Sequence, residues 1–154
     1  MMSNSNTATE ASTTKSVFVL ADHVERRARL EGTWLNIFDV TVSPGGGTPL
    51  HSHASPEVFR ILEGSLTIQR MSDSGLQEVE AIAGDIVSIP AHVPHGYSNP
   101  GPAPCVFSAI VDKEMAVYFE AADSSKPTDG TPDDEAAEQM IVAANAHGIH
   151  ILAA

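Results

Sequence analysis

Short apolar and polar runs alternate through residues 16–122, and Gly, Pro and Asp interrupt them at near-regular intervals. This pattern predicts many short β-strands connected by turns. The run "TWLNIFDVTV" places Trp34, Phe38, Val40 and Val42 at even spacing, and therefore on one face of a strand. Further strands are predicted at "EVFRIL", "SLTIQRM", "DIVSIP", "PCVFSAIV" and "AVYF". Together they favour an all-β sandwich or barrel.

The composition divides the chain into three parts. Residues 1–15 are small and polar, with nothing to bury, and are predicted to be disordered. Residues 16–122 form the predicted barrel. Residues 123–154 are predicted to be a linker, rich in Ser, Pro and Asp, followed by a helix.

The predicted C-terminal helix has signals at both ends. Thr131 is a suitable N-cap, Pro132 suits the first helical position, and Gly148 suits a left-handed C-terminal cap. We expect one face of this helix to pack on the rest of the protein, because three apolar residues form a stripe along it: Met140, Ile141 and Ala144.

Charge and cysteine content exclude some classes of function. The net charge is −12, so nucleic acids and anionic membranes are not expected as partners. Cys105 is the single cysteine, which rules out an intrachain disulfide and suggests a small buried hydrophobe rather than a nucleophile. With no apolar run resembling a signal peptide or a membrane span, we expect a cytoplasmic protein.

Two stretches carry candidate chemistry. In "GGGTPLHSHASPEVFRILEG", His51 and His53 share one face of an extended chain, and Glu57 lies at an even offset from both. Two imidazoles and a carboxylate that converge form a suitable site for a divalent transition metal, although an isolated His-x-His pair is about as often plain surface histidine. The second stretch, "GDIVSIPAHVPHGYSN", supplies His92 and His95.

Together the two stretches resemble the cupin family. The first matches its motif G-x5-H-x-H-x3-E-x6-G at every position, from Gly45 to Gly64. The second matches G-x5-P-x-G-x2-H-x3-N from Gly84 to Asn99, except that His92 replaces the usual glycine. The spacing of 19 residues between the motifs is similar to that of compact, single-domain bacterial cupins.

This resemblance implies a double-stranded β-helix, or jelly-roll barrel, with one divalent transition metal per chain. It implies that the metal ligands are His51, His53, Glu57 and His95. Three imidazoles and a carboxylate favour Fe, Mn, Ni, Cu or Zn over Mg or Ca. Four protein ligands would leave two positions of an octahedral metal open, which is typical of a catalytic site.

Other residues have weaker indications. His92 is interpreted either as an acid–base residue at the mouth of the pocket or, more often for such a position, as an exposed turn residue. His147 and His150 flank the end of the helix, where the helix dipole already explains a histidine. Strand parity places a set of inward apolar residues that either line the pocket or form plain core: Phe38, Val40, Phe59 and Ile61.

The leading functional hypothesis is a metal-dependent dioxygenase acting on a small, apolar, enolic or phenolic substrate. Quercetin dioxygenases, which the chain loosely resembles, suggest that Glu57 also accepts the substrate proton. The alternatives are a metal-dependent isomerase or epimerase and a non-catalytic cupin that binds a metal or small ligand. We also expect a homodimer in which "SVFVLADHV" (residues 16–24) crosses to the partner chain.

Overall fold

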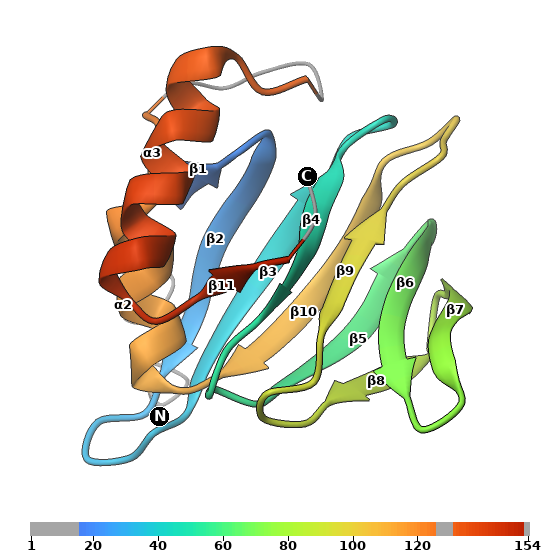
Figure 1. Cartoon of the computed structure of the whole chain (residues 1–154), viewed down its shortest axis with the longest axis horizontal. Helices are drawn as coiled ribbons and strands as arrows, with labels where there is room; N and C mark the ends of the chain where they lie inside the picture. The colour runs from blue at the N-terminus through green and yellow to red at the C-terminus, as the bar shows by residue number, and fades with distance from the viewer. Residues whose placement is uncertain (1–15, 126–130, 153–154) are drawn as a thin grey trace, which may run out of the picture.

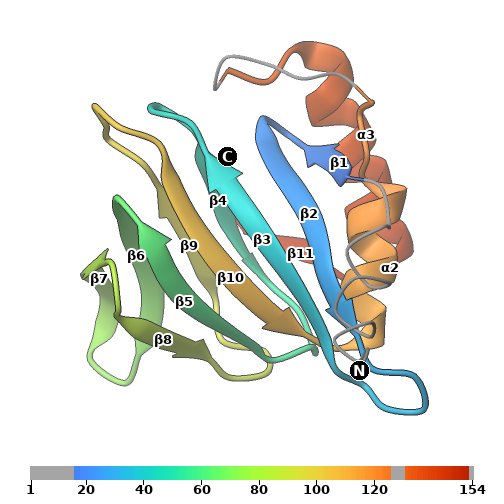
Figure 2. The ribbon, with the colours of Figure 1, turned by 180° about the vertical axis from the view of Figure 1, so that it is seen from behind.

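The computed structural model describes residues 16–125 and 131–152, which form two facing antiparallel sheets with two helices beside them (Figures 1 and 2). The predicted disorder of residues 1–15 lies outside these residues. In order across the sheet, the six-stranded sheet contains β1 (Ser16–Val19), β2 (Asp22–Arg29), β3 (Asn36–Val42), β10 (Cys105–Val111), β5 (Glu57–Glu63) and β8 (Ile86–Ile89). The five-stranded sheet contains β11 (His150–Ile151), β4 (Gly47–Ser52), β9 (His95–Ser98), β6 (Ser65–Ser72) and β7 (Gly75–Ile82).

Alternation of buried and exposed residues explains why the sheets face each other. Strands β3 and β10 are paired and both bury every second residue along their whole length. Their inward side chains, such as Val40 and Phe107, meet those of the opposite sheet in the core. The predicted all-β architecture is confirmed. Trp34 lies outside it, however, because β3 begins at Asn36 and leaves the indole 61% exposed.

Strands β1 and β2 form a tight hairpin within this chain. Val19 pairs with Asp22, so only Leu20 and Ala21 form the turn, and Leu20 has a left-handed φ of 56°. The outer edge of β1 is partly covered by two hydrogen bonds. The backbone N–H of Phe18 donates to the Asp123 carboxylate, and the carbonyl of Phe18 accepts from the backbone N–H of Ser124. Exchange of residues 16–24 with a second chain stays a prediction.

Two helices follow β10. The prediction of a strand at "AVYF" was wrong, since these residues belong to α2 (Lys113–Ala121). Asp112 starts the helix by accepting a hydrogen bond from the backbone N–H of Met115, as an N-cap residue does. The buried residues of α2, Met115, Ala116 and Tyr118, pack on the core.

The second helix, α3 (Asp134–Ala146), confirms the predicted C-terminal helix. Its N-cap is Asp133 rather than Thr131, because the Asp133 carboxylate accepts the N–H of Ala136. Gly148 has a φ of 72°, as predicted for the left-handed cap. Of the predicted apolar stripe, Met140 and Ala144 are buried but Ile141 is 46% exposed; Ala136 and Ala143 complete the buried face. The chain then turns into β11, which pairs with β4.

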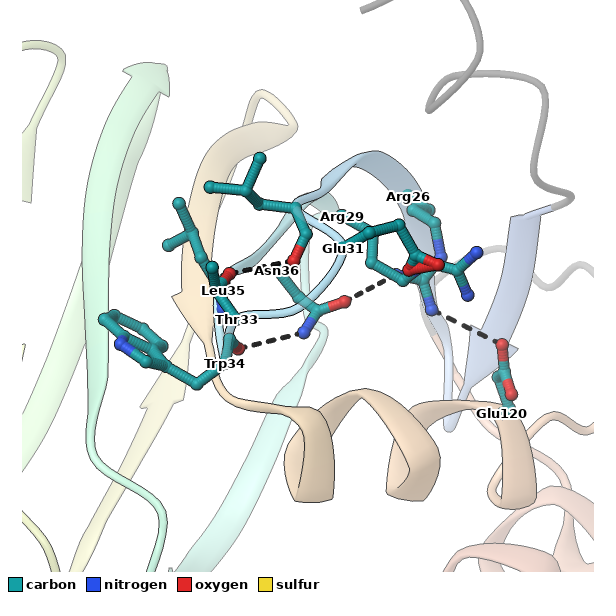
Figure 3. A network of polar contacts seen from close by, with 9 residues as sticks. Arg26, Arg29, Glu31, Thr33, Trp34, Leu35, Asn36 and Glu120 are labelled. Carbon is teal, nitrogen blue, oxygen red and sulfur yellow. Dashed lines mark hydrogen bonds and ion pairs between the residues drawn. The ribbon is translucent and has the colours of Figure 1, made fainter. Parts of the chain in front are cut away.

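A buried arginine attaches α2 to the six-stranded sheet (Figure 3). Arg26 of β2 donates to Asn36 Oδ1 at 2.7 Å and lies 4.8 Å above the centre of the Phe38 ring. Its other nitrogen lies 3.5 Å from Glu120 Oε2 on α2. Asn36 in turn donates to the carbonyl of Trp34, so the network also fixes the turn before β3.

We expect Arg26→Met to destabilise the protein by roughly 1–3 kcal/mol, because the buried Asn36 Oδ1 then loses its hydrogen-bond donor. Glu120→Gln should cost less than about 1 kcal/mol, since the Glu120 side chain is 56% exposed and water can replace its partner. Urea unfolding of the two variants measures both effects. Equal losses would show that the exposed ion pair, and not the buried hydrogen bond, carries the stability.

Candidate metal centre

The strand register brings three histidines together inside the barrel. His51 on β4 is the direct partner of His95 on β9, and their ring centres lie 4.3 Å apart. His53 follows the last residue of β4, so its ring lies on the same side as that of His51. One ring nitrogen from each of the three lies within 4.8 Å of the other two, an arrangement that can hold a metal ion.

Glu57, the first residue of β5, brings a carboxylate to the same point. Its Oε2 lies 3.1 Å from His53 Nε2 and 3.0 Å from His95 Nε2. His53, Glu57 and His95 are all buried, whereas His51 is half-buried. The structure therefore places side by side the four residues that the cupin resemblance assigns as ligands.

Backbone carbonyls fix the orientation of two of the rings. His51 Nδ1 lies 2.7 Å from the carbonyl oxygen of Pro49, and His95 Nδ1 lies 2.9 Å from that of Val93. Each carbonyl can only accept, so Nδ1 carries the proton and Nε2 of a neutral ring keeps its lone pair. A second-shell hydrogen bond of this kind is typical of metal-binding histidines.

The hydrogen bonds within this cluster leave buried polar atoms unpaired, which favours a bound metal ion. Both ring nitrogens of His53 are buried without a hydrogen-bond partner among the described residues, although Nε2 is close to Glu57. Buried polar atoms are normally paired, so the unpaired ring nitrogens of His53, lying beside a buried carboxylate, are well suited to a cation.

The electrostatics of the cluster prepare the ligands in the forms that bind metals. Burial alone would raise the pKa of Glu57, but interactions with His53 and His95 outweigh it and lower the pKa to about 2. Burial, together with repulsion from His95, lowers the pKa of His51 to about 4. At neutral pH Glu57 is therefore a carboxylate and His51 a neutral imidazole.

These residues open onto a cavity of about 70 Å³. That space holds several waters. Of the predicted lining residues, Val40 and Phe59 line the cavity. Phe38 and Ile61 are buried but do not reach it; Phe38 packs instead against Phe119 of α2. Side chains from both helices close part of the cavity: Met115, Tyr118, Phe119 and Met140.

His92 lies outside this cavity. It is exposed on the turn before β9, and its φ of 67° is the left-handed conformation for which the family motif usually has glycine. Its backbone N–H donates to the carbonyl of His53 at 2.7 Å. The turn thus helps to hold His53, a proposed metal ligand, while the imidazole of His92 does not line the cavity. Cys105 is fully buried, and burial raises the pKa of its thiol to about 11, so it belongs to the core.

Sequence reasoning missed an acidic residue in the cavity wall. Asp22, at the start of β2, is 2% exposed and lines the cavity together with Tyr97 of β9, whose hydroxyl donates to Asp22 Oδ2. The bond connects the two sheets across the interior. The alternation of side chains along the strands could have indicated both residues. Asp22 shares a strand face with the buried Val24, and Tyr97 shares one with His95.

Asp22 should make stability depend on pH. Burial, only partly opposed by the hydrogen bond from Tyr97, raises the pKa of Asp22 from 3.8 to about 7. Between these values the folded protein binds a proton at Asp22 that the unfolded chain has lost, so the free energy of unfolding falls as pH rises. The groups that interact with Asp22, namely Tyr97, Cys105 and Tyr118, all ionise above this range.

We therefore expect Asp22→Asn to gain stability relative to the parent protein as pH rises from 4 to 8, by on the order of 2–4 kcal/mol. Urea unfolding at several pH values measures this difference. A difference that stays constant with pH would contradict the raised pKa.

Comparison with known proteins supports the fold. Residues 38–111 match the family model of the cupin domain. Among solved structures, oxalate oxidase is 18% identical with a TM-score of 0.53, over 60% of this chain and 51% of that one. The plu4264 protein from Photorhabdus luminescens is 24% identical, with a TM-score of 0.55, over 69% of this chain and 88% of that one. A sugar phosphate isomerase of the cupin superfamily from Silicibacter pomeroyi is 23% identical, with a TM-score of 0.52, over 62% of this chain and 61% of that one.

The matched residues 38–111 contain both motifs on which the resemblance to cupins rests, and the solved structures share the fold. The chain spans about half the length of the oxalate oxidase chain. At these levels of identity the similarity concerns the fold. No helix within residues 16–125 and 131–152 is long and apolar enough to cross a membrane.

Proposed function

We propose that the protein binds one divalent transition metal through His51, His53, Glu57 and His95 and acts as a dioxygenase on a small enolic or phenolic substrate. The observation that supports the metal site most strongly is the convergence of three histidines on the Glu57 carboxylate, with both buried nitrogens of His53 unpaired among the described residues. When bound, the metal would supply Lewis acidity and a coordination position for the substrate oxygen. Imidazole and carboxylate ligands suit Fe, Mn, Ni, Cu or Zn.

The lining of the cavity supports an uncharged, apolar substrate. Apolar side chains dominate it, and among the described residues it contains no Lys or Arg. A phosphate or dicarboxylate would need such cations, and would also meet the negative charge of Glu57. For this reason we do not extend the substrates named for oxalate oxidase or the sugar phosphate isomerase to this protein.

Glu57 is the residue that we propose to accept the substrate proton. Glu57 lines the cavity beside His53 and His95, so a substrate hydroxyl that reaches the proposed metal comes within reach of its carboxylate. We assign His92 to the turn, because it is exposed and does not line the cavity.

Oxygen uptake by metal-loaded protein, measured over a panel of flavonols, catechols and other enols, tests this proposal. We expect uptake with at least one member of the panel, and its loss in Glu57→Gln. If no compound causes uptake with any of the five metals, the dioxygenase proposal fails. Solvent proton exchange into a keto substrate without oxygen uptake would favour the isomerase instead, since that reaction requires only proton transfer beside the metal.

A further inference from the structure

The cavity has a second polar position besides the proposed metal centre. Asp22 is buried and lines the cavity; its Oδ1 has no hydrogen-bond partner among the described residues, while Oδ2 is held by the hydroxyl of Tyr97. An unpaired buried acceptor is costly, and the presence of Asp22 in the wall of a mostly apolar cavity favours a partner supplied by a ligand.

The local backbone is strained where it presents this carboxylate. Leu20 occupies the first position of the two-residue turn before Asp22, with a φ of 56° that favours glycine. Leu20 is nevertheless buried and lines the same cavity. Strain of this kind tends to collect at functional sites, and here it accompanies the fixed position of Asp22.

The proposed metal centre and the Asp22–Tyr97 pair are connected through one strand, β9. His95 and Tyr97 are two residues apart on β9, so their side chains share a face and their Cα atoms lie roughly 7 Å apart. Between and around them the lining is apolar, with Phe59 and Phe107 against the Tyr97 ring. A ligand that reaches both positions needs a polar atom at each of two ends and an apolar body.

We propose that Asp22 is a specificity-determining residue that accepts a hydrogen bond from a hydroxyl or amine of the substrate, at the end opposite to the oxygen that binds the metal. This inference rests on the proposed function, and it narrows the substrate class to apolar enols or phenols with a second hydrogen-bond donor. Tyr97 acts as a positioning residue, because its hydroxyl holds Oδ2 and leaves Oδ1 as the unpaired acceptor.

A matched pair of probes tests the inference by binding rather than turnover. Zinc-loaded full-length protein is titrated by calorimetry with 4-(hydroxymethyl)phenol and with 4-(methoxymethyl)phenol, which lacks the donor hydrogen. The pH is 8.5, above the pKa of about 7 of Asp22, so the carboxylate can only accept. We expect the parent protein to bind the hydroxymethyl probe about tenfold more tightly or better.

Asp22→Asn should lose this preference, because the amide oxygen takes the Tyr97 hydroxyl and leaves an NH₂ donor facing the ligand. Asp39→Asn is the matched control: Asp39 contacts Ser108 and Arg27, lies outside the cavity lining, and its variant should keep the preference. Equal binding of both probes to the parent overturns the role of Asp22 and leaves the proposed function intact, and this result needs no variant to fold. A preference retained by Asp22→Asn also overturns the role. If neither probe binds the zinc-loaded parent, both the role and the phenolic substrate class fail.

Discussion

Replacing His53 with alanine is expected to lower the affinity for a divalent transition metal by roughly 100-fold or more, because even the loss of an outer-shell partner typically costs 10–100-fold. Both ring nitrogens of His53 are buried and have no hydrogen-bond partner within residues 16–125 and 131–152, so its lone pair is available to a metal. The loss should be seen with Zn, Mn, Fe, Ni and Cu alike, since each accepts imidazole.

Calorimetric titration of the metal-free protein measures this loss, and thermal unfolding provides a second readout. A ligand that binds only the folded state raises its melting temperature, so the same metal concentration should stabilise the parent protein more than His53→Ala. His23→Ala is the control, because His23 lies on β2, contacts Phe18 and is absent from the cavity lining. Unchanged affinity in His53→Ala would exclude this residue from the site.

Replacing Gly64 with alanine is expected to destabilise the protein by roughly 3 kcal/mol or more. Gly64 connects β5 to β6 with a φ of 74°, and an added Cβ would lie 2.5 Å from the carbonyl oxygen of Pro104. Because the contact is with backbone that leads into β10, no side chain can move away to relieve it.

Gly84→Ala separates the two contributions. Gly84 has a φ of 97°, also left-handed, but an added Cβ there has no atom within 4 Å. Its variant therefore reports the cost of the backbone conformation alone, about 1–2 kcal/mol. Urea unfolding of the two variants should show Gly64→Ala as clearly the less stable. Equal losses would mean that the approach of Pro104 relaxes at little cost.

The first three residues of the candidate metal centre were predictable because they are close in the sequence: the His51-x-His53 spacing places both rings on one side of the chain, and Glu57 follows four residues later. His95 lies 38 residues beyond Glu57 and was predicted only through the resemblance of the second stretch to the cupin motif. Asp22 was not predictable in this way. Its partner is 75 residues away, and the turn that presents it is formed by Leu20 and Ala21, neither of which is a typical turn residue.

The errors in the strand assignment have similar causes. The run "AVYF" is too short for its period to distinguish a strand from a buried helix, and the deciding feature is the hydrogen bond from Met115 to Asp112 just before it. Parity placed Phe38 and Val40 on the inner face, and both are buried. Parity does not state which inward side chains meet a cavity and which, like Phe38, meet a helix.

Anomalous scattering from crystals of manganese-loaded protein tests the metal centre most directly. We predict one strong anomalous peak per chain, within about 2.0–2.3 Å of a ring nitrogen of His51, His53 and His95 and of a carboxylate oxygen of Glu57. The peak should be lost in crystals of His53→Ala. A peak elsewhere, or none at these residues in the loaded parent protein, would contradict the proposed metal centre.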